Sequence, residues 1–133
     1  MLKLEIVTPE KKVLDAEVET VSVPTASGEA GILTNHAPLV SELKPGILSY
    51  TAKGSSEKIA VSGGFVEVSG NSVSVLTDTA ETSSEIDLDA AKADRDAAEK
   101  ELAAVATHDV DSTAAIRERV EAANARVQLA SGR

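Results

Sequence analysis

The sequence lacks cysteine altogether, and it is poor in histidine and in aromatic residues. The absence of cysteine excludes a disulfide framework, a thiolate nucleophile and any zinc site that is built on cysteine. The two histidines, His36 and His108, are too few for a histidine metal cluster, so no metal site is expected. Tyr50 and Phe65 are the only aromatic residues, and we therefore expect no stacking platform for bases or sugars.

Positive charge and long apolar runs are also scarce. The chain has 13 basic and 22 acidic residues, and the net charge of −9 would repel the phosphate backbone of a nucleic acid. No run approaches the ~20 apolar residues of a transmembrane helix, so we expect no direct membrane insertion. We expect no signal or transit peptide either, because the N-terminus lacks an apolar stretch and carries an acidic residue, Glu5. A soluble, reducing compartment is the expected setting.

The composition changes near residue 85. All four prolines and seven of the eight glycines lie at or before Gly70. Valine falls from eleven in residues 1–85 to four afterwards, whereas alanine rises from seven to fourteen. β-Branched residues interrupted by Gly and Pro are typical of short strands, and alanine mixed with charged residues is typical of helix. We therefore predict an antiparallel β-sandwich or flattened barrel over residues 1–85, followed by an antiparallel α-helical hairpin over residues 86–133.

Alternation and turn residues place the strands. Leu2, Leu4 and Ile6 alternate with charged residues and predict a strand with one buried face. The turn signals at residues 53–56 and 70–71 predict β-hairpins. Further strands are predicted over residues 17–23, 46–52, 57–62, 65–68 and 72–79.

The second half carries apolar seams at helical spacing. One seam runs from Ile116 to Ala130, and another runs from Leu88 to Val105, where Arg95 interrupts it. The expected N-cap of the second helix is one of two residues, Asp111 or Ser112. A buried Leu or Val contributes about 1.5–3 kcal/mol and Ala far less, so these alanine-rich seams predict a marginal hairpin whose docked position is easy to change.

Candidates for chemistry are few. His36 lies two residues before Pro38 and is expected on an exposed loop. A catalytic interpretation would pair it with Glu29 or a serine, and the ordinary interpretation is a loop histidine that makes a hydrogen bond or a partner contact. The glycines of residues 28–31 and 63–64 match no phosphate-binding motif and are expected in turns or bulges. The acids near residues 87–96 lack EF-hand spacing and are expected to cap the helix and complement its dipole.

Two features are suited to interaction. The Pro-bearing stretch of residues 33–40 is apolar, and it is either a core loop or a docking loop. Arginine is absent from residues 1–85 but occurs in the last predicted helix at Arg117, Arg119 and Arg126. Such charges usually form a solvated face, although arginines on a detachable helix can also bind carboxylates of a partner.

Several short motifs occur in order along nearly the whole chain. They are GEAGIL at residues 28–33, HAPL at 36–39, LKPG at 43–46, SGGFVEV at 62–68, VLTDTAE at 75–81 and DLD at 87–89. With this ordered set the chain resembles the epsilon subunit of the rotary F-type ATP synthase, the bacterial counterpart of the mitochondrial delta subunit.

The resemblance implies a non-catalytic central-stalk subunit of the proton-transporting enzyme, which couples the gamma subunit to the c-ring. The residues that it places in a loop facing the c-ring are Gly28, Glu29, Gly31, Ile32 and Leu33. The residues that it places toward the gamma subunit are His36, Ala37 and Pro38. It further implies a peripheral location on the cytoplasmic side of the bacterial plasma membrane, through the ATP synthase complex.

The resemblance also implies that the hairpin is a conformational inhibitor of ATP hydrolysis, which reaches the alpha/beta catalytic head when extended. The residues concerned are Asp89, Lys92, Arg117, Arg119 and Arg126. Some family members bind ATP through an [IL]-D-x-x-R-A motif, in which this chain has Lys92 in place of arginine, and Ala122 replaces a further arginine. Lysine lacks the planar fork and alanine lacks a donor, so we expect weak or absent ATP binding and no other cofactor.

Two alternatives remain open at this point. One is a stand-alone ligand-binding β-sandwich that forms a symmetric dimer through its helices, whereas the stalk hypothesis predicts a monomer when isolated. The other is an enzyme that uses His36 with Glu29.

Overall fold

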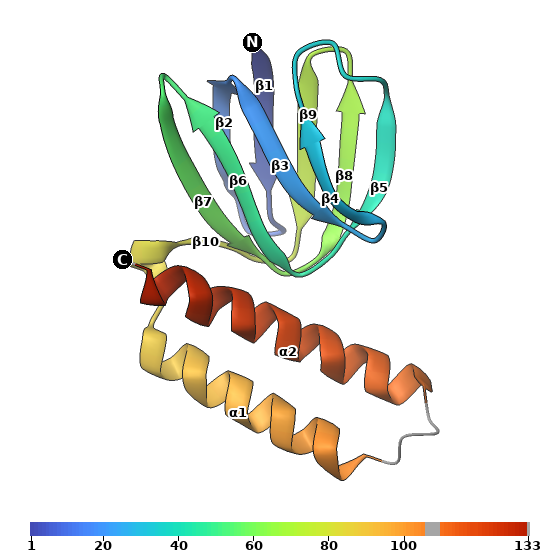
Figure 1. The fold of residues 1–133 in the computed structure, drawn as a ribbon, viewed down its shortest axis with the longest axis vertical. Coiled ribbons are helices and arrows are strands. Elements are labelled where there is room, and N and C mark those ends of the chain that lie inside the picture. Colours follow the sequence, from blue (N-terminus) through green and yellow to red (C-terminus); the bar gives the residue numbers. More distant parts are fainter. Residues whose placement is uncertain (106–109, 133) are drawn as a thin grey trace.

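The computed structural model describes residues 1–105 and 110–132 of the chain. Figure 1 shows the strands gathered in one unit and two antiparallel helices lying across one end of it. The predicted β-sandwich or flattened barrel, followed by a helical hairpin, is confirmed. His108, which we expected to be solvated, lies outside the described residues.

Ten strands form one strongly curved sheet. They are β1 (Leu2–Val7), β2 (Lys12–Val18), β3 (Thr20–Thr25), β4 (Gly28–Ile32), β5 (Leu39–Leu43), β6 (Gly46–Ala52), β7 (Ser55–Val61), β8 (Gly64–Ser69), β9 (Ser72–Thr77) and β10 (Ala80–Thr82). Their order in the sheet is β10-β7-β6-β3-β5-β8-β9-β1-β2, and β4 pairs with β3 off this path. The pairing is antiparallel throughout except between β1 and β9, which run parallel.

Alternating side chains fill the space that the sheet encloses. Leu2, Leu4 and Ile6 of β1 are each 0% exposed, so the predicted buried face is confirmed. Valines and leucines from β3, β6, β8 and β9 complete the same apolar cluster. Because each fully buried aliphatic side chain stabilises the fold by about 1.5–3 kcal/mol, this core requires neither aromatic residues nor disulfides.

The turns at residues 53–54 and 70–71 form the two predicted hairpins. Lys53 and Gly54 adopt positive φ angles of 54° and 80° between β6 and β7. Two further glycines lie where β8 begins. Gly63 has a φ of 126° and Gly64 has a φ of 134°. A Cβ on Gly64 would lie 1.8 Å from the carbonyl oxygen of Leu76, so only glycine allows β8 to approach β9 so closely.

Some strands differ from the prediction. The single strand expected over residues 17–23 is divided, because β2 ends at Val18 and β3 begins at Thr20. Strands β4, β5 and β10 were not predicted, since their residues carry little alternation and form strands by pairing with β3, β8 and β7.

Two helices follow a single turn of 3-10 helix, η1 (Ser83–Glu85). Helix α1 (Leu88–Ala104) begins at an N-cap, Asp87, whose side chain accepts a hydrogen bond from the Ala90 amide at 3.1 Å. Helix α2 spans Val110–Ser131. The end of η1 coincides with the predicted boundary at residue 85, but the division into separate domains stays a prediction.

Two expectations for the helices are wrong. Asp111 and Ser112 cannot be N-caps because α2 begins before them, at Val110. Asp94 and Asp96 lie beyond the first turn of α1 and pair with arginines instead of capping it. Within the described residues, no helix combines the length and apolar character that a membrane span requires.

Candidate functional site

The helical hairpin docks on one end of the strands through a small apolar cluster (Figure 1). Its buried members are Ala60, Ile86, Ala91, Leu129 and Ala130, and the partly buried residues around them are Ile47, Leu88 and Val127. Ile86 and Leu129 are the only large side chains in the buried set. Because the free energy of burial scales with apolar area, this cluster stabilises docking far less than the main core stabilises the strands.

Polar contacts complete the docking. The Ser83 hydroxyl donates to the carbonyl oxygen of Leu129 at 3.2 Å, which ties the end of α2 to η1. The guanidinium of Arg126 donates from Nε to Glu81 of β10 at 2.8 Å and from Nη1 to Asp94 of α1 at 3.2 Å. Arg126 therefore contacts the strands and the first helix at the same time.

The other hairpin residues implied by the resemblance lie on the surface. Arg119 pairs with Glu101 across the two helices. Arg117, Asp89 and Lys92 are exposed, and in the part of the chain that the structure describes their side chains form no ion pair. The structure therefore does not bring Asp89 or Lys92 to the guanidinium of Arg126.

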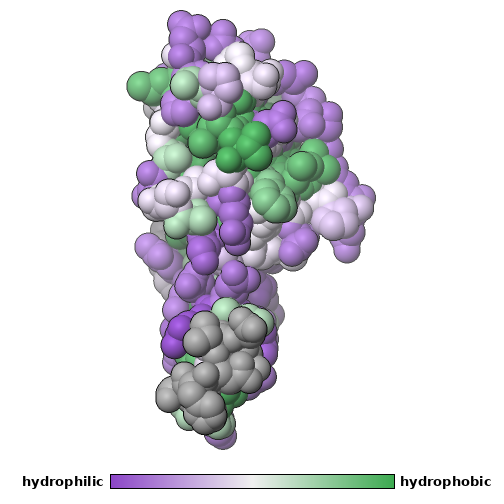
Figure 2. Space-filling view, turned by 90° about the vertical axis from the view of Figure 1, so that its right-hand side faces the viewer, coloured by the Kyte–Doolittle hydropathy of each residue, from purple (hydrophilic) through white to green (hydrophobic). Residues whose placement is uncertain are grey.

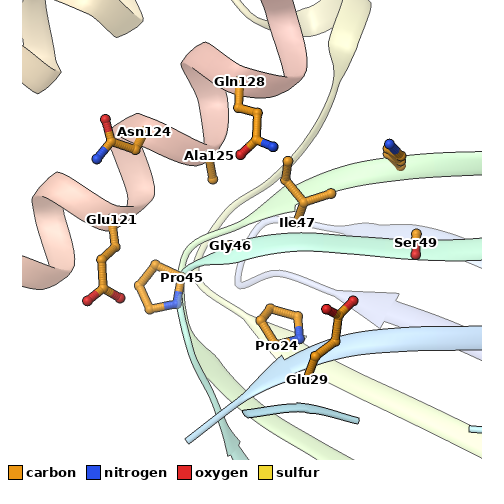
Figure 3. Close-up of a pocket in the computed structure, with 11 residues that line it drawn as sticks. Pro24, Glu29, Pro45, Gly46, Ile47, Ser49, Glu121, Asn124, Ala125 and Gln128 are labelled. Atoms are coloured by element: carbon orange, nitrogen blue, oxygen red, sulfur yellow. The ribbon is translucent and has the colours of Figure 1, made fainter. Parts of the chain in front are cut away.

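A polar groove of about 550 Å³ separates α2 from the strands next to the apolar cluster (Figure 3). Glu121, Asn124 and Gln128 of α2 line one wall. Glu29 of β4 and Lys58 of β7 lie on the other wall. The groove adjoins the apolar cluster, since Ile47 belongs to both.

Strand β4 contains most of the residues that the resemblance places in a loop facing the c-ring. Those in the strand are Gly28, Glu29, Gly31 and Ile32. The loop expectation is therefore wrong for them, because residues 28–32 pair in register with β3. Ile32 is 0% exposed in the core, whereas Leu33, just beyond the strand, is 60% exposed. The carboxylate of Glu29 accepts a hydrogen bond from the Ser22 hydroxyl.

The loop between β4 and β5 carries the residues implied to face the gamma subunit. These are His36, Ala37 and Pro38, of which His36 is half-buried and the others are exposed. The His36 amide donates to the Leu33 carbonyl at 3.1 Å, and this closes a turn. Asn35, at φ 66°, donates its amide to Oδ1 of Asn71 at 2.9 Å. The loop is thus fixed to the turn between β8 and β9.

An exposed apolar face lies on the outer side of β5, β8 and β9, and the sequence analysis did not single it out. Val40 is 72% exposed, Phe65 58% and Leu76 54%. Phe65 and Leu76 are direct cross-strand partners. Figure 2 shows apolar residues gathered on the strand unit in this view. We call Val40, Phe65 and Leu76 the apolar face; a patch of this kind is typical of an interaction site.

Strand parity is the signal that could have revealed the apolar face. Val66 and Val68 predict that the even positions of β8 point inward, which places the aromatic ring of Phe65 outside. The same argument applies to β9, where Val73 and Val75 are buried and Leu76 is not. By contrast, no local signal links Arg126 to Glu81, which is 45 residues away in the chain.

Shifted pKa values occur outside any catalytic grouping. The Thr82 amide and hydroxyl both donate to the Glu85 carboxylate, and these hydrogen bonds hold the pKa of Glu85 below its ordinary value. Burial, helped by the charge of Glu57, raises the pKa of Tyr50. Hydrogen bonds first to Glu5 and then to Asp15 raise the pKa of Lys12.

The described residues show no arrangement suited to catalysis. The ring nitrogen Nδ1 of His36 lies 2.6 Å from the Ala37 carbonyl oxygen, and Glu29 is bonded to Ser22, so no hydrogen bond joins His36 to Glu29. Over residues 1–105 and 110–132 no group of three or more His, Asp or Glu side chains could hold a metal ion. The geometry is that of a strand unit with a helical hairpin docked on one end.

Comparison with known proteins gives a consistent result. The family described as "ATP synthase, Delta/Epsilon chain, beta-sandwich domain" matches residues 1–83. An ATP synthase epsilon chain of Desulfitobacterium hafniense (strain Y51) is 54% identical over 99 residues, which are 74% of this chain and 75% of that protein. An ATP synthase epsilon chain of Anaeromyxobacter dehalogenans is 42% identical over 129 residues, 97% of each chain.

Solved structures share the fold. A chain in the Euglena gracilis mitochondrial ATP synthase structure (OSCP/F1/c-ring, rotational state 1) has a TM-score of 0.79 at 24% identity, covering 98% of this chain and 81% of that chain. The match of the β-sandwich family and the relatives, one of them covered over 97% of its length, confirm the resemblance seen in the sequence motifs. The chain therefore belongs to the ATP synthase epsilon-chain family, whose members are non-catalytic subunits of that enzyme.

Proposed function

We propose that this chain is a central-stalk subunit of a proton-transporting rotary ATP synthase, where it couples the gamma subunit to the c-ring. Its hairpin acts as a conformational inhibitor of ATP hydrolysis by extending toward the alpha/beta catalytic head. The chain is a monomer when isolated and is held, through the complex, at the cytoplasmic side of the bacterial plasma membrane. Relatives named as ATP synthase epsilon chains support this assembly.

The observation that carries the inhibitory half is the weak docking of the hairpin. Among the described contacts, an apolar cluster with two large buried side chains, Ile86 and Leu129, one hydrogen bond from the Ser83 hydroxyl and one ion pair hold it to the strand unit. An appendage with so few contacts can have two arrangements that differ by a few kcal/mol, and a partner that binds one of them better shifts the population.

The apolar face and the adjoining loop support the coupling half. Phe65, Leu76 and Val40 present an exposed apolar surface to gamma. The loop at residues 36–38 adds a further contact to the same subunit. Toward the c-ring we propose Glu29 and Leu33, with the other residues of β4 as their support. A large aromatic side chain is a frequent anchor of a protein interface, and Phe65 lies directly opposite Leu76 on this face.

The hydrolysis rate of the assembled ATPase tests the inhibitory half. Deletion of residues 87–133 is expected to accelerate ATP hydrolysis, because the strands that bind the stalk remain while the inhibitor is lost. A matched variant in which Arg117, Arg119 and Arg126 are all alanine should weaken inhibition without removing the helices. An unchanged hydrolysis rate in both proteins would contradict the inhibitory role.

Binding to the gamma subunit tests the coupling half. Phe65→Ser is expected to weaken capture of gamma at least tenfold, since truncation of a central aromatic anchor costs about 2 kcal/mol or more. Thr51→Ser, on β6 outside the apolar face, is the control and should bind like the parent chain. Equal capture of gamma by Phe65→Ser would contradict the assignment of this face.

Nucleotide binding is expected to be weak or absent. Lys92 and Asp89 are exposed on α1, and Arg126 is already engaged by two carboxylates. Calorimetric titration with ATP should therefore show no heat of binding at micromolar concentrations. A micromolar affinity would contradict this part of the proposal.

A further inference from the structure

Arg126 is the residue at which three elements meet. Its Nε donates to Glu81 on β10 at 2.8 Å, and its Nη1 donates to Asp94 on α1 at 3.2 Å. Within residues 1–105 and 110–132, the Arg126–Glu81 pair is the only ion pair that joins the hairpin to the strands. Among the described contacts between α2 and the strand unit, the small apolar cluster and the bond from the Ser83 hydroxyl to Leu129 remain when this pair is lost.

The surroundings make this pair stronger than the Arg119–Glu101 ion pair of the hairpin. The Arg126 and Glu81 side chains are 24% and 27% exposed, whereas those of Arg119 and Glu101 are 55% and 50% exposed. Solvent screens a partly buried pair less than an exposed one. The planar guanidinium also offers separate donors to the two carboxylates, which the single ammonium of a lysine cannot do in the same geometry.

We propose that Arg126 is a latch: its pairing with Glu81 and Asp94 keeps the hairpin docked and occupies the guanidinium. Glu81 and Asp94 then compete with the carboxylates of an acidic partner surface for the same side chain. The competition with a partner rests on the proposed inhibitory function, because only a released hairpin can present Arg126 to the catalytic head. The latch itself is a property of the isolated chain.

Hydrogen exchange of the isolated full-length protein tests the latch. Glu81→Gln removes the charge of the strand partner and keeps its shape, and it is expected to raise the opening equilibrium of α2 about threefold to tenfold. Glu17→Gln is the matched control, because Glu17 is an exposed glutamate of β2 that forms none of the ion pairs described for residues 1–105 and 110–132. The amides of β1 and β8 should exchange alike in all three proteins.

Salt and a second substitution sharpen the test. Raising the ionic strength should increase opening of α2 in the parent chain and have little further effect on Glu81→Gln. Arg126→Gln alone, and combined with Glu81→Gln, should open α2 to a similar extent, because the two residues act as one contact. Equal exchange of α2 in Glu81→Gln and Glu17→Gln would overturn the latch.

The assembled ATPase separates the latch from the inhibitory function. Glu81→Gln keeps Arg126 but removes the charge that holds it to the strands. The released hairpin should inhibit more strongly, so ATP hydrolysis should fall below that of the parent complex. If Glu81→Gln opens α2 in the isolated protein and leaves hydrolysis unchanged, the inhibitory function fails and the latch stands. If α2 does not open, the latch fails whatever the hydrolysis rate.

Discussion

The side chain of Asn71 holds the backbone of Asn35, with 2.9 Å between the Asn35 amide nitrogen and the Asn71 Oδ1. Asn35 has a positive φ of 66°, which costs free energy for a residue other than glycine. The hydrogen bond from Asn71 helps to offset this cost. A residue in the turn between β8 and β9 thereby fixes the conformation of the loop at residues 33–38.

Asn71→Ala is expected to release this loop. Loss of the acceptor should cost about 1 kcal/mol locally and speed exchange of the Asn35 amide about fivefold. Asn71→Asp keeps an acceptor oxygen and should leave the exchange rate near that of the parent chain. Hydrogen exchange measured by NMR would decide, and slow exchange at Asn35 in Asn71→Ala would contradict the role given to Asn71.

Gly64→Ala is expected to destabilise the strands severely. A Cβ at this position would lie 1.8 Å from the carbonyl oxygen of Leu76, and the φ of 134° is one that alanine rarely adopts. The expected loss is about 3 kcal/mol or more, visible as a lower urea midpoint or as failure to fold. Gly31→Ala is the control, since its Cβ would meet nothing within 4 Å, and it should unfold like the parent chain.

Leu129→Ala is expected to release the hairpin while the strands stay folded. Leu129 is 8% exposed and belongs to the docking cluster, where removing its side chain costs about 2 kcal/mol or more. Hydrogen exchange should become faster in α2 and stay unchanged in β1 and β8. Leu48→Ala, in the main core, should instead accelerate exchange in the strands. Loss of protection in the strands of Leu129→Ala would show that the two clusters unfold together.

The Glu85 carboxylate should make stability depend on pH in the acid range. Its pKa is lowered in the folded chain by hydrogen bonds from Thr82, so the unfolded chain binds the proton more tightly. The contribution of Glu85 is thus fully present above its ordinary pKa and is lost as the pH falls through the lowered value. Urea unfolding should show a difference between the parent chain and Glu85→Gln at pH 7 that disappears in acid. A difference independent of pH would contradict this assignment.

Much of the fold could be predicted because it depends on local patterns. The alternation of Leu2, Leu4 and Ile6, the positive-φ turn at Gly54 and the helical seam ending at Ala130 are each visible within a few residues. Strand β4 was missed because its sequence, GEAGI, has little β-propensity and becomes a strand only by pairing with β3. Pairing between distant segments outweighs local preference there.

The candidate site was predicted less completely for the same reason. Arg126 was predicted to contact a partner protein, and its contacts within the chain were not predicted. Glu81 and Asp94 belong to other elements, and no spacing rule connects them to Arg126. Glu29 was assigned to a loop, whereas pairing with β3 places it in a strand that borders a groove shared with α2.

The parallel pairing of β1 with β9 has a consequence for how the chain is made. Strand β1 pairs with β2, which follows it directly, but its other neighbour, β9, ends at Thr77, so the sheet around β1 is complete only after most of the strand unit has been synthesised. Closing such a distant contact is slow, whereas a helical hairpin forms from neighbouring segments within microseconds. We therefore expect closure of the sheet between β1 and β9 to be the slow step of folding, and docking of the hairpin to follow it.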